Sequence, residues 1–95
     1  MSTTYRKKPE EYLKDYSVML DYWDAEQGDS HLMVDYRELI EESSGDLSND
    51  QKALLKSLDA KAKALLDSCQ GTETWDVQML RAAVSIAYPE YRKAA

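Results

Sequence analysis

The sequence contains few of the residues from which catalytic and redox sites are built. Its 95 residues include one cysteine, Cys69, one histidine, His31, and three glycines. Most catalytic constellations cannot be assembled from this set, and no glycine-rich phosphate loop or nucleophile elbow is present. A lone cysteine also forms no internal disulfide, which fits a reducing compartment. We therefore expect a cytoplasmic protein that is not an enzyme and uses neither a cofactor nor a metal.

Long apolar runs and an excess of basic residues are also missing. The longest apolar runs are three residues, as at 18–20 and 32–34, so we expect no membrane-spanning segment. The basic N-terminus is not followed by an apolar stretch, so we expect no signal peptide. Eighteen Asp and Glu against twelve Lys and Arg give a net charge of −6. This charge argues against direct binding of nucleic acid, because phosphate contacts need a basic surface.

Phenylalanine is absent, and no alternating run of β-branched residues predicts a strand. Three short gaps rich in Gly, Ser, Thr and Asp, at 27–30, 43–48 and 70–74, separate segments with helical periodicity. In each gap a glycine follows one segment as an αL cap, and a Ser, Thr or Asp precedes the next as an N-cap. Ser48 and Gln51 have the spacing of a capping box.

The apolar periodicity predicts helices over 9–27, 31–43, 49–69 and 75–88. Loops of about three to six residues favour antiparallel neighbours. We therefore expect one all-α domain over 1–95, a compact bundle of about four antiparallel helices, with loose tails at 1–7 and 92–95. Leu58 and Leu65 should lie near the centre of the core. The full set of expected core positions is Tyr12, Tyr16, Met19, Leu20, Trp23, Leu32, Met33, Tyr36, Leu39, Ile40, Leu54, Leu55, Leu58, Ala62, Leu65, Leu66, Cys69, Val77, Leu80, Val84, Ala87 and Tyr88.

Charge is distributed unevenly along the chain. Residues 10–50 hold thirteen acids and two bases, a net charge of −11, whereas residues 51–95 carry +2. If the first two helices lie side by side, they present about one acid per 3 Å, against about one charge per 1.7 Å in duplex DNA. Such a surface attracts basic protein surfaces, including those of nucleic-acid-binding proteins. The alternative is that the acids only maintain solubility.

The sequence thus favours a small acidic binding protein, an inhibitor or adaptor, that docks an acidic helical face onto a basic protein. Imitation of nucleic acid is one form that such docking takes. Tyr22 is a candidate anchor, because with Val18 and Ala25 it forms a second patch about 100–140° from the core stripe of its helix. The expected partner-binding residues are Asp21, Tyr22, Asp24, Glu26, Asp35, Glu38, Glu41 and Glu42.

The last predicted helix has an unusually wide apolar surface, covering roughly 240° of its circumference. Either the other helices bury this surface, which we favour, or it forms a seam for a second copy or for a larger assembly. A homodimer and a structural subunit therefore remain alternatives. The candidate seam residues are Trp75, Met79, Ala83 and Ile86.

One column of polar residues has the spacing of a metal site. His31, Asp35, Glu38 and Glu42 lie within roughly a 60° arc of the second predicted helix. A metal-dependent enzyme is the third alternative. A solvated polar face is the simpler interpretation, because no ligand from another helix can be identified.

Overall fold

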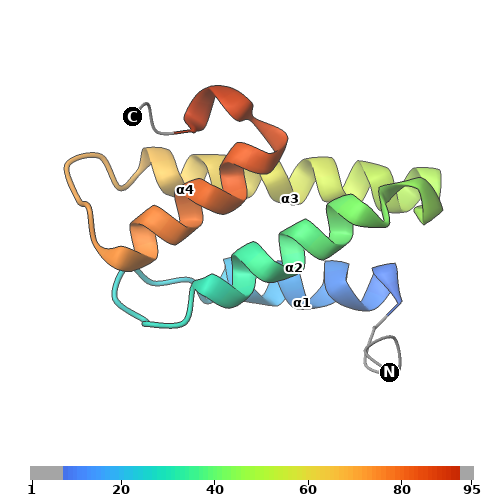
Figure 1. The fold of residues 1–95 in the computed structure, drawn as a ribbon, viewed down its shortest axis with the longest axis horizontal. Coiled ribbons are helices and arrows are strands. Elements are labelled where there is room, and N and C mark those ends of the chain that lie inside the picture. Colours follow the sequence, from blue (N-terminus) through green and yellow to red (C-terminus); the bar gives the residue numbers. More distant parts are fainter. Residues whose placement is uncertain (1–7, 93–95) are drawn as a thin grey trace.

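A computed structural model describes residues 8–92, and this part of the chain folds into an all-α bundle without a strand (Figure 1). The predicted fold class is confirmed. Within residues 8–92 no helix has both the length and the apolar character needed to cross a bilayer. The elements in chain order are α1 (Pro9–Asp21), α2 (His31–Glu42), η2 (Ser44–Asp46), α3 (Asn49–Asp67), α4 (Trp75–Ala87) and η3 (Pro89–Tyr91).

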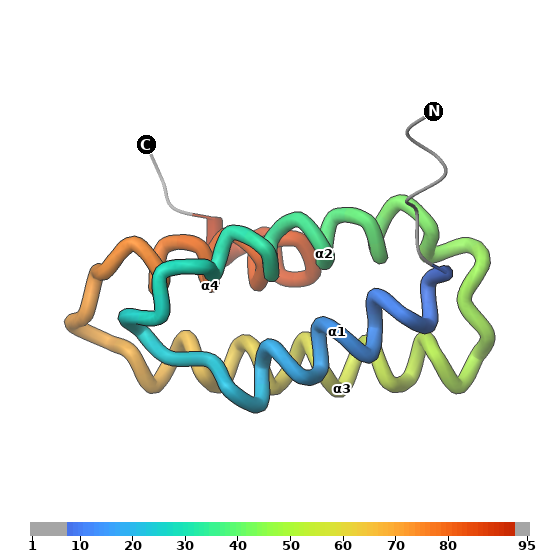
Figure 2. The backbone as a smooth tube through the Cα atoms, turned by 90° about the horizontal axis from the view of Figure 1, so that it is seen from below, coloured from blue at the N-terminus to red at the C-terminus, as the bar shows by residue number. Residues whose placement is uncertain are grey.

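The helices form two layers, α2 with α4 and α1 with α3 (Figure 2). Consecutive helices run antiparallel, so α1 and α2 form one hairpin and α3 and α4 form another (Figure 1). Each helix packs mainly against two others, and α2 faces α3 across the diagonal of the bundle. The two most acidic helices, α1 and α2, are therefore direct neighbours.

The core is built from residues at helical spacing on all four helices. Leu58 is 6% exposed, as predicted, whereas Leu65 is only half-buried. Leu13 was not among the predicted core positions but is 1% exposed. The most deeply buried large side chains are Leu13, Tyr16, Leu20, Met33, Ile40, Val77, Leu80 and Val84.

The predicted first helix, 9–27, is too long. α1 ends at Asp21, and residues 22–30 form a loop instead. Trp23 is half-buried and donates from its indole nitrogen to the Ser30 hydroxyl at 3.0 Å. The Asp24 N–H donates to the side chain of Gln27 at 2.8 Å, which closes a turn within this loop. These two hydrogen bonds within the loop replace part of the helical hydrogen bonding.

Two leucines predicted for the core are exposed. Leu32 has 38% and Leu54 has 45% of its surface accessible. Leu54 lies about 100° around α3 from buried Leu55, at the margin of the apolar stripe. Cys69 is half-buried against the core, as its position on that stripe predicts.

The helix-capping predictions are confirmed in part. Ser48 and Gln51 form the predicted capping box, with hydrogen bonds of 2.8 and 3.1 Å. Gly28 and Gly71 have φ angles of 88° and 87°, the left-handed conformation that only glycine adopts easily. Gly45, which was also predicted as an αL cap, does not have a positive φ angle, because it lies within η2. Ser30 makes no side-chain cap on α2.

The predicted tails fall almost entirely outside the described residues. Residues 1–7 and 93–95 are not described. Arg92 is described, and its N–H donates to the carbonyl of Pro89 at 3.0 Å, so this residue belongs to the turn that follows η3.

Candidate functional site

Four of the five large hydrophobic side chains exposed in the described chain lie toward one end of the bundle, where α1 ends and α2 and α4 begin (Figure 1). They are Val18, Tyr22, Leu32 and Trp75. Tyr22 is the most exposed, with 81% of its surface accessible. Exposed apolar groups that gather in this way mark contact surfaces more often than scattered ones do. This end of the molecule is therefore the candidate site.

A groove of about 220 Å³ lies between α1 and α2 at this end. Tyr22 occupies the C-cap of α1, one residue beyond the helix, and its side chain lies at the wall of this groove. The lining combines apolar side chains of both helices with two polar residues of the loop, and we call it the Tyr22 groove: Val18, Met19, Tyr22, Gln27, Asp29, Leu32 and Met33.

The loop beside the Tyr22 groove is fixed by Asp76 of α4. Its carboxylate accepts hydrogen bonds from the Gly28 N–H at 3.0 Å, from the Ser30 hydroxyl at 2.7 Å and from the Ser30 N–H at 3.3 Å. Thr74 adds a bond from its hydroxyl to the Ala25 carbonyl at 2.6 Å. Burial disfavours the charged carboxylate, but the hydrogen bonds from Ser30 and Gly28 outweigh it and lower the pKa of Asp76. The groove wall is therefore held by a long-range polar anchor.

Three of the predicted carboxylates share one open side of α2. Asp35, Glu38 and Glu42 line a depression of about 360 Å³ together with Leu39. All three acids are exposed. We call these three residues the acidic face.

Two more of the predicted acids lie on the loop beside the groove. Asp24 and Glu26 are exposed, and the Asp24 carboxylate accepts the Glu26 N–H at 2.8 Å. With Asp29, which lines the Tyr22 groove, they place three carboxylates around the loop. The groove and its surroundings therefore combine apolar area with negative charge.

Asp21 and Glu41 are also exposed, but each forms an ion pair within the chain. Asp21 pairs with Lys61 of α3. Glu41 pairs with the buried Arg37 at 3.1 Å. Each thus contacts a cation of the same chain, although Arg37 is shared with Asp59, and a helical projection of the sequence does not show these pairs.

The four candidate seam residues of α4 do not form one open face. Ala83 is completely buried, and Met79 and Ile86 are half-buried. Trp75 has 46% of its surface exposed, and its ring lies 5.7 Å from the ring of His31. The wide apolar surface is therefore divided between core contacts and one exposed aromatic residue.

The metal alternative gains no geometric support. Within residues 8–92, no three His, Cys, Asp or Glu side chains are grouped so that they could hold an ion. His31 contacts the Trp75 ring at the start of α4.

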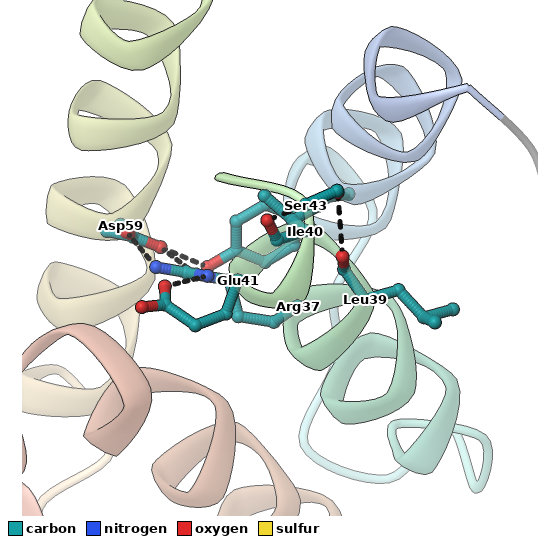
Figure 3. Close-up of polar contacts among 7 residues, drawn as sticks. Arg37, Leu39, Ile40, Glu41, Ser43 and Asp59 are labelled. Carbon is teal, nitrogen blue, oxygen red and sulfur yellow. Dashed lines mark hydrogen bonds and ion pairs between the residues drawn. The ribbon is translucent and has the colours of Figure 1, made fainter. Parts of the chain in front are cut away.

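A buried charge network is the main feature that the sequence analysis missed. Arg37 of α2 and Asp59 of α3 are 2% and 5% exposed, and they pair across the diagonal of the bundle (Figure 3). The guanidinium donates through Nε to Oδ1 and through Nη2 to Oδ2, both at 2.9 Å. Tyr16 of α1 donates its hydroxyl to the same carboxylate at 2.9 Å.

The electrostatics of this network favour the charged pair. Burial and the neighbouring Asp59 carboxylate raise the pKa of Tyr16 well above its ordinary value, so its hydroxyl stays a donor. Burial acts against the charged form of Arg37, but its hydrogen bonds to Asp59 outweigh this and raise the pKa of Arg37. Among the described residues no buried side-chain nitrogen or oxygen lacks a hydrogen-bond partner.

Comparisons with protein-family models, with curated proteins and with solved structures gave no match. We therefore infer the function from the surface features of this chain.

Proposed function

We propose that this protein is a small non-enzymatic binding protein that docks the Tyr22 groove and the acidic face onto a basic protein surface, as an inhibitor or adaptor. The observation that carries the proposal is the position of Tyr22. It is the most exposed large hydrophobic side chain of the described residues, and it borders an apolar groove with carboxylates beside it. Tyrosine is favoured in such places because it combines apolar area with a polar tip.

The groove and the acidic face are arranged along one helix. Leu32 lines the Tyr22 groove and Leu39 lies among the acids, seven residues further along α2, a rise of about 10 Å. A complementary partner would insert an apolar side chain into the groove and place lysines or arginines about 10 Å away. A basic amphipathic helix has this pattern.

Close imitation of nucleic acid is less well supported than recognition of basic side chains. The first and last acids of the acidic face are seven positions apart on α2, so the three acids follow one another at about 5 Å along the helix axis on average. Along the axis of duplex DNA, the phosphates of one strand recur about every 3.4 Å. Asp21 and Glu41, which the sequence analysis placed on this surface, are paired with Lys61 and Arg37.

The test compares two triple variants that change the net charge equally. Reversal of the acidic face, Asp35→Lys with Glu38→Lys and Glu42→Lys, should leave the fold intact because all three side chains are exposed. The control reverses three exposed acids elsewhere: Asp46, Asp50 and Glu90.

Both variants and the wild type would be used at low and high salt to capture partners from a host extract, with Tyr22→Ala as a fourth bait. We expect basic proteins retained by the wild type and the control to be lost from the acidic-face variant and from Tyr22→Ala. Binding kinetics of a purified partner should show a slower association for the acidic-face variant and a faster dissociation for Tyr22→Ala. Equal retention of the same partners by all four baits would refute the proposal.

The exposed Trp75 favours a second candidate, a structural subunit or homodimer that docks through the start of α4. Its ring is accessible over nearly half of its surface and lies against His31 rather than within the core. This surface differs from the Tyr22 groove, so variants of α4 separate the two candidates.

A further inference from the structure

A second pocket, of about 450 Å³, opens at the other end of the bundle. It exists because α4 is shorter than α3, with 13 residues against 19. Tyr88 caps α4 and is followed by Pro89, which lacks the N–H that a longer helix would need at this position. The chain therefore turns away, and the first turns of α3 extend beyond the end of α4 (Figure 1). The pocket is lined by Ser44, Gly45, Leu47, Lys52, Leu55, Lys56, Asp59, Ala87 and Tyr88.

The walls of this pocket are mainly apolar. Leu47 and Leu55 are 6% and 8% exposed, and Tyr88 is half-buried. The volume lies within the range of about 300–1,000 Å³ typical of small-molecule sites. The pocket therefore suits the apolar body of a small ligand.

Two exposed lysines, Lys52 and Lys56, supply the charge. They lie one helical turn apart on α3, a spacing at which like charges repel. Lys61 and Lys63, further along the same helix, pair with Asp21 and Asp67, whereas within residues 8–92 neither Lys52 nor Lys56 forms an ion pair. An anion placed between the two ammonium groups would relieve their repulsion.

The one acid in the lining does not oppose an anion. Both oxygens of Asp59 are bound by the Arg37 guanidinium at 2.9 Å. The carboxylate is also 5% exposed and accepts the Tyr16 hydroxyl. The charge of Asp59 is therefore compensated, and the two lysines determine the preference of the pocket.

We propose that this pocket binds a small amphipathic carboxylate, with the anionic group between Lys52 and Lys56 and the apolar body against Leu47, Leu55 and Tyr88. The site is separate from the Tyr22 groove and does not depend on the proposed docking function.

The experiment uses two probes with the same aromatic body, 2-naphthoate and the neutral 2-naphthalenemethanol. Their affinities would be measured by calorimetry and by NMR titration of the full chain. The double variant Lys52→Gln/Lys56→Gln removes the two pocket cations. The control, Lys61→Gln/Lys63→Gln, removes the same charge from the same helix outside the pocket.

The wild type should bind naphthoate about tenfold more tightly than the alcohol, as expected for one anion beside two exposed cations. The pocket variant should reduce the affinity for naphthoate to that for the alcohol, and the control should retain the wild-type preference. Shifted amide signals should map to Leu47, Leu55 and Ala87. Equal affinities for the two probes, an equal loss in the control, shifts at another surface, or no binding at millimolar concentration would each overturn the proposal.

Discussion

Removal of Arg37 should destabilise the bundle far more than removal of an exposed cation. In Arg37→Met, the Asp59 carboxylate remains buried and keeps only the Tyr16 hydroxyl of its three donors. Breaking one side of a buried ion pair costs about 3–5 kcal/mol. Such a loss is a large part of the roughly 5–15 kcal/mol by which small domains are stable. The exposed Lys61–Asp21 pair provides the control, and Lys61→Met should cost less than about 1 kcal/mol.

Tyr16 gives a sharper form of this prediction, because the effect of Tyr16→Phe should change sign with the background. In the wild type the substitution removes a hydrogen bond to a carboxylate, worth about 1.5–3 kcal/mol. In the double variant Arg37→Met/Asp59→Leu the Tyr16 hydroxyl is buried without its acceptor, a penalty of about 1–3 kcal/mol. There Tyr16→Phe should restore stability, because it removes the unpaired group.

Urea unfolding followed by circular dichroism and by the fluorescence of Trp23 and Trp75 gives the free energies that these comparisons need. The variant Arg37→Met/Asp59→Leu should lose less unfolding free energy than the single variants Arg37→Met and Asp59→Leu lose together. The difference should be at least about 3 kcal/mol, because the double variant leaves no isolated charge. The reasoning is refuted if Arg37→Met costs no more than Lys61→Met. It is also refuted if Tyr16→Phe destabilises both backgrounds alike.

Two further expectations concern the loop and α4. Asp76→Asn should lower stability at neutral pH. The folded-state pKa of Asp76 is lowered, so its contribution is complete above the ordinary aspartate pKa of about 3.9 and is lost as the pH falls through the lowered value. The difference in unfolding free energy between wild type and Asp76→Asn should therefore shrink below about pH 4, and a difference that stays constant there would contradict an ionic role. On α4, Met79→Glu and Ile86→Glu place charges at half-buried positions and should lower stability without changing the mass measured by light scattering. If the wild type is a dimer and these variants are folded monomers, α4 instead forms the seam.

Helical periodicity was sufficient to predict the fold class and most of the core, because these depend on local spacing. The same helical spacing also indicated where the buried network lies. Arg37 stands at helical spacing between Met33 and Ile40, and Asp59 has the same relation to Leu55 and Ala62. Both charges therefore lie on apolar stripes. Their pairing was not predictable, because it depends on α2 and α3 facing each other across the diagonal.

The end of α1 could not be predicted for a related reason. Residues 22–27 continue the helical pattern, but the loop is stabilised by Asp76, 48 residues beyond Gly28. Local propensity and a distant hydrogen-bond acceptor compete here, and the distant acceptor prevails. The consequence for the candidate site is direct, because ending the helix at Asp21 places Tyr22 at its C-cap beside the groove.

The two polar networks have a common effect on α2, which carries the acidic face and one wall of the Tyr22 groove. Asp76 holds Ser30 at the start of this helix, and Asp59 holds Arg37 in its second half. An element held at its start and near its middle loses less conformational entropy when it binds, and association is weakened chiefly by such losses and by desolvation. Rigid presentation matters most for a surface whose charges are spaced several ångströms apart, because each must meet a particular cation of the partner. On the proposed function, the interior charges that stabilise the bundle also keep the docking surface in place for its partner.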